Sequence, residues 1–199
     1  MQVGKEKYMS KDIDHFASSE YHNEIIVSLK RWLREQIADG WKGYFLNFMF
    51  DQLGGNQAAL RSKVKDEVER FYAKVVTRIV RNPRSSTASG KLPIFVGCPD
   101  LPVWKHEKAS LSTVTINGGL HFNGISLLPA ISRLKTGFRT HMRQRKRFYA
   151  DGKRGLRRVQ VERIRQAPGY VADYALKALK HGRISYDDLL ILPKHPSEL

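Results

Sequence analysis

The run GYFLNFMF, residues 43–50, restricts the fold of this chain more than any other segment, because it concentrates aromatic and apolar side chains over a short stretch. Glycines lie on both sides of it, with Gly40 before the run and Gly54 after it. A short apolar run between such breaks is typical of a buried strand. We therefore predict a central core strand over residues 44–50.

The segments around this run alternate between helical and extended patterns. Residues 56–81 give the clearest helix, since Leu60, Val64 and Phe71 recur on one face. Similar patterns predict further helices over 18–39, 129–149 and 168–181. They also predict strands over 92–98, 112–118, 120–128 and 159–165, the middle two of which could be one strand with a kink.

This order of elements predicts an α+β fold, in which helices pack against a central antiparallel sheet. The 199 residues suffice for one domain with appendages. We expect an N-terminal helical segment over 1–40, a main domain over 41–183 and a C-terminal tail over 184–199.

The chain is strongly basic, with a net charge of +16. The segment 131–165 contains thirteen Lys and Arg residues against two acidic residues, so it carries +11 of that charge. A solvated basic helix is the simpler interpretation, but such a field favours a polyanionic partner, most often nucleic acid. The expected nucleic-acid-binding residues are Arg139, Arg143, Arg145, Lys146, Arg147, Lys153, Arg154, Arg157 and Arg158, with Phe138, Phe148 and Tyr149 to stack on unpaired bases.

The composition also bears on the compartment. No apolar run approaches the length of a membrane span, and the first residues contain no apolar core of a signal peptide. The single cysteine, Cys98, excludes an internal disulfide and suits a reducing compartment. We expect a cytoplasmic protein with no membrane partner, in which Cys98 is a buried thiol.

His121 and Asn123 lie two residues apart in the apolar run LHFNGISLL. In a strand they would share a face, where an imidazole and a carboxamide oxygen could hold a divalent metal ion. Gly124 would then let another backbone approach closely. The alternative is two polar residues with a purely structural role.

Tyr170, Asp173, Tyr174 and Lys177 recur at helical spacing and share one face of a predicted helix. A phenol can act as a covalent nucleophile, and a nearby ammonium can neutralise a phosphate. Tyrosines at this spacing are also common at the edge of an amphipathic core.

Three of these stretches, in this chain order, resemble the motifs of the HUH superfamily of single-stranded DNA nicking enzymes, which includes rolling-circle replication initiators of phages and plasmids. FLNFMF resembles its first motif, an apolar strand of the FLTLTF type. HFNGI resembles its His-hydrophobic-His motif, except that Asn123 replaces the second histidine. YVADYALK resembles its Tyr-x-x-x-Tyr-x-x-Lys helix. The likeness covers roughly residues 44–180.

The resemblance implies an RRM-like palm and a rolling-circle replication initiator from a mobile element. Its partner would be single-stranded DNA, nicked and rejoined through a tyrosine–5′-phosphate intermediate. It implies Tyr174 as the first-ranked nucleophile, Tyr170 as the second, and Lys177 as the residue that steadies the phosphate. A Mg²⁺ or Mn²⁺ ion would bind His121, Asn123 and a third ligand, for which Asp173, Asp51 and His106 compete.

The sequence contains no Gly-Lys-Ser/Thr phosphate loop, so a helicase would have to come from another protein, such as one of the host. Two alternatives to the nicking enzyme stay open. One is a nucleic-acid-binding protein on the same fold with a silent metal site. The other is a basic RNA- or ribosome-associated protein, in which the tyrosines and His121 have structural roles only.

Overall fold

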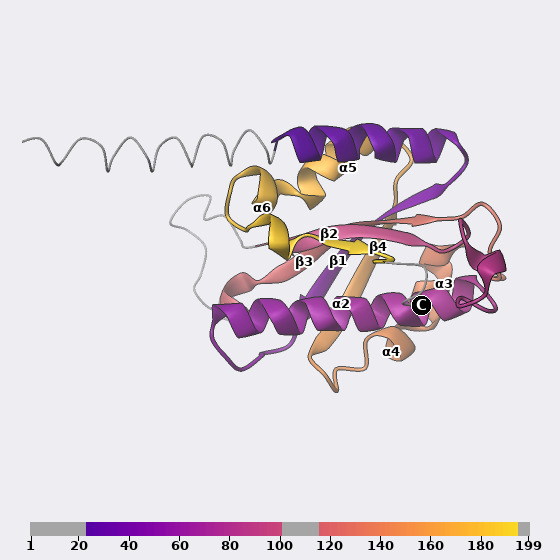
Figure 1. The fold of residues 1–199 in the computed structure, drawn as a ribbon. Coiled ribbons are helices and arrows are strands. Elements are labelled where there is room, and N and C mark those ends of the chain that lie inside the picture. Colours follow the sequence, from indigo (N-terminus) through magenta and orange to yellow (C-terminus); the bar gives the residue numbers. More distant parts are fainter. Residues whose placement is uncertain (1–22, 101–115, 195–199) are drawn as a thin grey trace, which may run out of the picture.

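A five-stranded antiparallel sheet forms the centre of the computed structural model, which describes residues 23–100 and 116–194 (Figure 1). The predicted α+β class is confirmed, as is the strand at the centre of the core. From one edge to the other the strands are β4 (Leu156–Arg163), β1 (Lys42–Phe50), β3 (His121–Leu128), β2 (Ile94–Asp100) and β5 (Leu190–Leu192).

The first four strands follow a recognisable connection order. A long helix, α2 (Gln57–Ile79), joins β1 to β2, which lie apart because β3 pairs between them. Two short helices, α3 (Phe138–Gln144) and α4 (Lys146–Tyr149), join β3 to β4, which returns to pair with the free side of β1. This is the split βαβ arrangement of ferredoxin-like folds.

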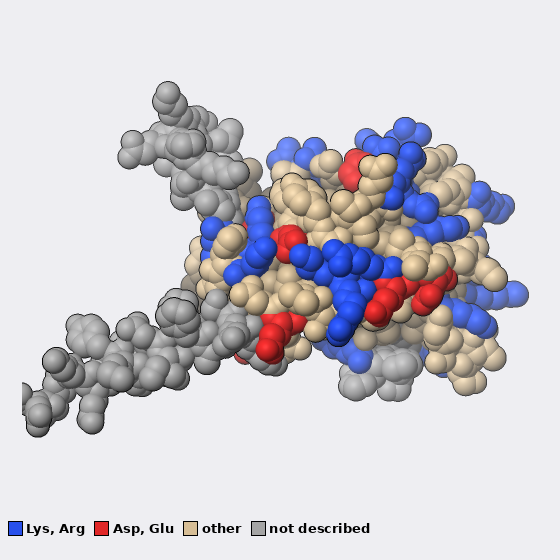
Figure 2. Space-filling model, turned by 90° about the horizontal axis from the view of Figure 1, so that it is seen from above, with Lys and Arg blue, Asp and Glu red and all other residues tan. Residues whose placement is uncertain are grey.

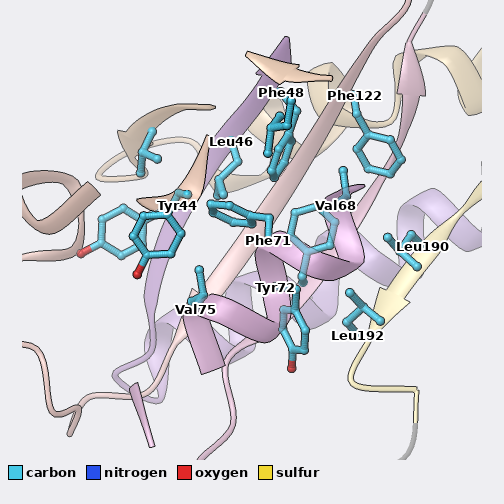
Figure 3. Packing of buried hydrophobic residues seen from close by; sticks show 14 of the residues in the cluster. Tyr44, Leu46, Phe48, Val68, Phe71, Tyr72, Val75, Phe122, Leu190 and Leu192 are labelled. Carbon is cyan, nitrogen blue, oxygen red and sulfur yellow. The ribbon is translucent and has the colours of Figure 1, made fainter. Parts of the chain in front are cut away.

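The α2 helix covers one face of the sheet. Asn56 caps it by accepting a hydrogen bond from the backbone N–H of Ala59 at 2.9 Å. Its apolar stripe packs on alternate residues of β1 and β3 (Figure 3). Phe48 lies at the middle of this core, fully buried, with the rings of Phe71, Phe95 and Phe122 at 5.0, 5.9 and 6.1 Å between centroids.

The other face is covered by the helix of residues 23–38 together with α5 (Pro168–Ala175) and α6 (Lys177–Lys180) (Figure 1). Pro168 stands in the first turn of α5, as expected. Ala172, Ala175 and Ala178 are almost fully buried, and their small side chains let the helices approach the sheet closely. The predicted helix 168–181 is interrupted at Leu176, whose backbone is no longer helical.

Two sequence-based expectations about the elements are wrong. Residues 129–137 are not helical, and α3 begins only after Gly137. In place of a strand, Ile116–Gly119 forms a tight turn, because Asn117 and Gly118 adopt left-handed backbone angles. Residues 112–115 of that expected strand lie outside the described part of the chain.

The tail contributes to the sheet. Its strand β5 pairs with β2, and Leu190 and Leu192 are buried in the core over α2 (Figure 3). Along the described ranges, no helix combines the length and apolar character needed to cross a bilayer.

Gly124 faces the core on β3, where no larger residue fits. A Cβ atom at this position would overlap the ring of Phe95 and lie 3.0 Å from the carbonyl oxygen of Val96. We predict that Gly124→Ala lowers the free energy of unfolding by about 1–3 kcal/mol, because the core is overpacked. Urea denaturation measures the change. Gly54→Ala is the matched control, since nothing lies within 4 Å of its Cβ position; equal effects of the two substitutions would contradict the prediction.

Candidate active site

A buried carboxylate at the end of β2 collects polar side chains from two other elements. Asp100 pairs in register with His121 of β3 and is fully buried. Its Oδ2 lies 3.1 Å from Nε2 of His121, 2.8 Å from Nζ of Lys177 and 2.9 Å from Nδ2 of Asn123. We call Asp100, His121, Asn123 and Lys177 the Asp100 cluster. It brings together three of the residues singled out by the sequence.

Neighbouring groups fix the orientation of the cluster. Asn47 of β1 donates from Nδ2 to Oδ1 of Asn123 at 2.7 Å. Nδ1 of His121 lies 3.0 Å from the carbonyl oxygen of Gly119, which can only accept, so Nδ1 donates and Nε2 points at Asp100. The side chains of His121 and Lys177 are 23% and 26% exposed, so solvent and a ligand can reach the cluster at these two residues.

Asp100 is the charged centre of this arrangement. Burial acts to raise its pKa, but the hydrogen bonds from His121 and Lys177, with their charges, outweigh burial and hold the pKa below its ordinary value. The carboxylate is therefore ionised at neutral pH. Its Oδ1 is buried and has no hydrogen-bond partner among the described residues, which leaves acceptor capacity unused inside the site.

The tyrosines lie beside the cluster on α5. Tyr174 packs edge-on against Phe45 of β1, with 5.5 Å between ring centroids, and Nζ of Lys177 lies 4.8 Å from the centre of the Tyr174 ring. Lys177 therefore contacts both Tyr174 and Asp100. Tyr170, one turn earlier, is 72% exposed. Both tyrosines line an open groove whose other wall is the end of β4 and the residues after it, 162–166.

The expected third ligands do not join the cluster. Asp173 is held by Lys30 and Lys180 and is not part of the Asp100 cluster. Asp51 lies 3.8 Å from Arg157 and takes part in no contact with the cluster. His106 lies outside the described residues. Sequence reasoning missed Asp100, although its place at the end of the strand PIFVGCPD put it opposite the HFN segment.

Two side chains of the cluster are of types that can bind a divalent ion. Within residues 23–100 and 116–194, no group of three His, Cys, Asp or Glu side chains is arranged for a metal. Asp100 and His121 nevertheless supply a carboxylate and an imidazole nitrogen that face each other, as ligands of a shared metal ion would. Asn123 could add its oxygen as a third ligand only with its amide turned over, because Oδ1 accepts from Asn47 and the NH₂ group faces Asp100 and His121. The unpartnered Oδ1 of Asp100 adds a further hard donor.

The basic residues form a second feature, at the outer edge of the sheet. Arg139, Arg143, Lys146 and Arg158 line a groove between α3 and β4, and Arg145, Arg147, Lys153, Arg154 and Arg157 are exposed nearby. Lys and Arg also predominate among the charged side chains on the face with the helix of 23–38 and α5 (Figure 2). Arg163 and Arg165 line the groove beside the tyrosines, although neither was among the residues predicted to bind nucleic acid.

The prediction that three aromatic side chains stack on bases is wrong for two of them. Phe138 and Tyr149 are each 2% exposed and belong to the core under α2, so they cannot stack on a base. Phe148 is 40% exposed and keeps that possibility. The sequence alone does not show which aromatic side chains of these short helices face the core and which face solvent. Cys98 is buried, as predicted.

No protein-family model, no curated protein and no solved structure matches this chain.

The Asp100 cluster makes the free energy of unfolding depend on pH in the acid range. Because the folded-state pKa of Asp100 is lowered, its contribution is present above the unfolded pKa and is lost as the pH falls through the folded value. We predict that the free energy lost in Asp100→Asn, relative to the natural chain, shrinks as the pH is lowered from about 5 to about 3.

Urea denaturation at a series of pH values measures this difference. Asp66→Asn is the control, because Asp66 is exposed on α2, and it should change the free energy little at any pH. A loss in Asp100→Asn that stays constant down to the acid limit would contradict the ionised, hydrogen-bonded carboxylate.

Proposed function

We propose that this protein nicks and rejoins single-stranded DNA through a covalent tyrosine–5′-phosphate intermediate, as the resemblance to HUH enzymes implies. One observation carries the proposal. Asp100 ties the HFN segment on β3 to Lys177, which in turn contacts Tyr174. Two motifs some fifty residues apart in the sequence are thus placed within one site. A structural role for each motif separately would not require this convergence.

The chemistry follows from the position of Tyr174. Tyr174 lines an open groove, and its hydroxyl would attack a phosphodiester bound there. Oη attacks phosphorus, the P–O3′ bond breaks, and the 3′ oxygen takes up a proton in place of the one that the phenol loses. The phosphate stays on the tyrosine, and attack by a 3′ hydroxyl reverses the reaction. Neither water nor a redox partner is consumed.

The other residues would position and neutralise the phosphate. Asp100, His121 and Asn123 would hold Mg²⁺ or Mn²⁺, which supplies Lewis-acid stabilisation of the phosphate oxygens when bound. Lys177 carries a positive charge 4.8 Å from the Tyr174 ring, where it can balance negative charge on the phosphate or the phenol oxygen. Arg163 and Arg165 line the groove and can bind flanking phosphates.

A second candidate function is nucleic-acid binding without cleavage. The Lys177 ammonium lies 2.8 Å from Oδ2 of Asp100, so a cation of the chain itself already balances that carboxylate. Asn123 also directs its NH₂ group, and not its oxygen, at Asp100. Both features favour a site that needs no metal. This alternative predicts tight DNA binding with no covalent adduct.

The nicking assay tests the proposal directly. We expect that the protein, incubated with a pool of labelled single-stranded DNA and Mn²⁺ or Mg²⁺, forms a protein–DNA adduct that survives denaturation and is absent in EDTA. Tyr174→Phe should abolish the adduct, because the nucleophilic oxygen is gone. Tight binding with no adduct under any metal would leave the binding protein.

Two tyrosine controls sharpen this assay. Tyr170→Phe should keep the adduct if Tyr174 is the nucleophile. Tyr186→Phe should keep it in either case, because Tyr186 is as exposed as Tyr174, 44% against 45%, and follows α6 in the chain outside the groove. Loss of the adduct in Tyr170→Phe with retention in Tyr174→Phe would reverse the assignment of the nucleophile.

Metal binding distinguishes the ligand set without any need for activity. We predict that a Mn²⁺ concentration of about a hundred times the dissociation constant stabilises the protein by about 2.7 kcal/mol, measured from urea unfolding curves. His121→Ala should remove this stabilisation. Asp173→Asn should keep it, because Asp173 is bound to lysines away from the cluster. Loss of the effect in Asp173→Asn alone would contradict the assignment of Asp100 as the acidic ligand.

A further inference from the structure

The sequence contains two long stretches without any acidic residue. Residues 70–99 and residues 108–150 contain no Asp or Glu, although both are rich in Lys and Arg. In the fold, the first stretch provides the second half of α2, and the second provides α3 and α4. These parts lie on the same side of the sheet, opposite to α5 and α6 (Figure 1). These segments contribute cations and no carboxylate of their own to the far face from Tyr174.

Phe148 is the centre of this surface. The residue is 40% exposed, and the guanidinium carbon of Arg78 and Nζ of Lys74 lie 4.7 and 5.4 Å from its ring centroid. Nζ of Lys74 also donates to the carbonyl oxygen of Phe148 at 2.8 Å. The ring of Tyr149, buried beneath, supports Phe148 at 5.0 Å between centroids. An exposed aromatic ring is thus held in place and surrounded by cations.

Arg145 adds to the same positive field. Arg145 and Arg78 both act to lower the pKa of His141, in addition to the larger effect of burial, so both charges lie close to this side chain. Among the described residues, Lys74, Arg78 and Arg145 form no ion pair with a carboxylate. The nearest acidic residues along the chain have other partners: Glu69 pairs with Lys194, and Asp151 accepts a hydrogen bond from the backbone N–H of Lys153. We call Lys74, Arg78, Arg145 and Phe148 the second cationic surface.

We propose that the second cationic surface binds an unpaired segment of DNA, with a base stacked on Phe148 and phosphates paired with Lys74, Arg78 and Arg145. The combination of an exposed ring with unneutralised cations fits single-stranded nucleic acid, because the ring offers stacking energy and the cations release counterions from the backbone. A purely acidic protein partner would use the charges but not the supported ring.

The position of the second cationic surface suggests a route that a bound DNA strand could follow over the protein. The groove between α3 and β4 is lined by Arg158 on the sheet edge and by Arg143 and Lys146, which lie two residues before and one residue after Arg145 in the sequence. It links the edge of the sheet to α4. A strand held at Tyr174 would thus pass around the β4 edge and reach Phe148 on the opposite face. The inference rests on the proposed function for the identity of the ligand as DNA.

The test uses affinity and salt dependence with a long fluorescent oligothymidylate in EDTA, in the Tyr174→Phe background, so that no cleavage intervenes. Arg78→Gln with Arg145→Gln should weaken binding and reduce the slope of log affinity against log salt by about 1.4, the value for two lost single-strand phosphate contacts. Phe148→Leu should weaken binding about 10-fold with an unchanged slope, because it removes stacking and no charge.

The charge-matched control removes two cations from the first half of α2, away from Arg78. Lys63→Gln with Lys65→Gln should change affinity and slope clearly less than the Arg78 and Arg145 pair. The Phe148→Leu protein should bind a blunt-ended duplex as tightly as the protein with Phe148 does, because paired bases cannot stack on the ring. Urea unfolding of each variant shows that the fold is kept.

Several results would overturn the inference. Equal effects of the two charge pairs would mean that only net charge matters, and an equal loss on duplex would assign Phe148 a structural role. The outcome is separable from that of the proposed function. Adduct formation with no effect of these variants defeats the second surface alone, whereas the predicted binding changes with no adduct in the natural chain defeat the nicking reaction alone.

Discussion

The buried charge of Asp100 determines how α5 and α6 are held against the sheet. A carboxylate that is fully withdrawn from water is costly unless hydrogen bonds and opposite charges compensate it. The compensating groups come from β3 and from the start of α6. The helices on this face therefore cannot shift along the sheet without breaking the cluster, and the same interaction that orders them also holds Tyr174 at the groove.

The sequence predicted the elements whose patterns were long and unambiguous. β1, α2 and β3 were found with nearly their observed ends, because apolar runs and helical stripes are local properties. The shared face of His121 and Asn123 also followed from strand geometry. The prediction failed for 129–137, where a basic composition was read as helix although the segment before Gly137 has no helical backbone. It failed at Asn117 and Gly118, where left-handed angles end any strand.

The site was harder to predict than the fold, because its key residue is defined by a partner strand. Asp100 is visible in the sequence only as a residue at the end of a predicted strand, and its role appears in the register of β2 with β3. Asp173 was one candidate for the third ligand because it lies beside the tyrosines, but its carboxylate turns to Lys30 and Lys180. Burial likewise separates Phe148 from Phe138 and Tyr149, which composition treats alike.

The arginines of β4 have a consequence for the solution behaviour of the chain. β4 is an edge strand eight residues long, and such an edge offers unpaired backbone groups to a second copy. Arg157, Arg158 and Arg163 are exposed along it, and like charges on two approaching copies repel each other. The side chains expected to attract a polyanion thus also keep free molecules apart, and a bound polyanion that neutralises them would remove this protection against edge-to-edge association.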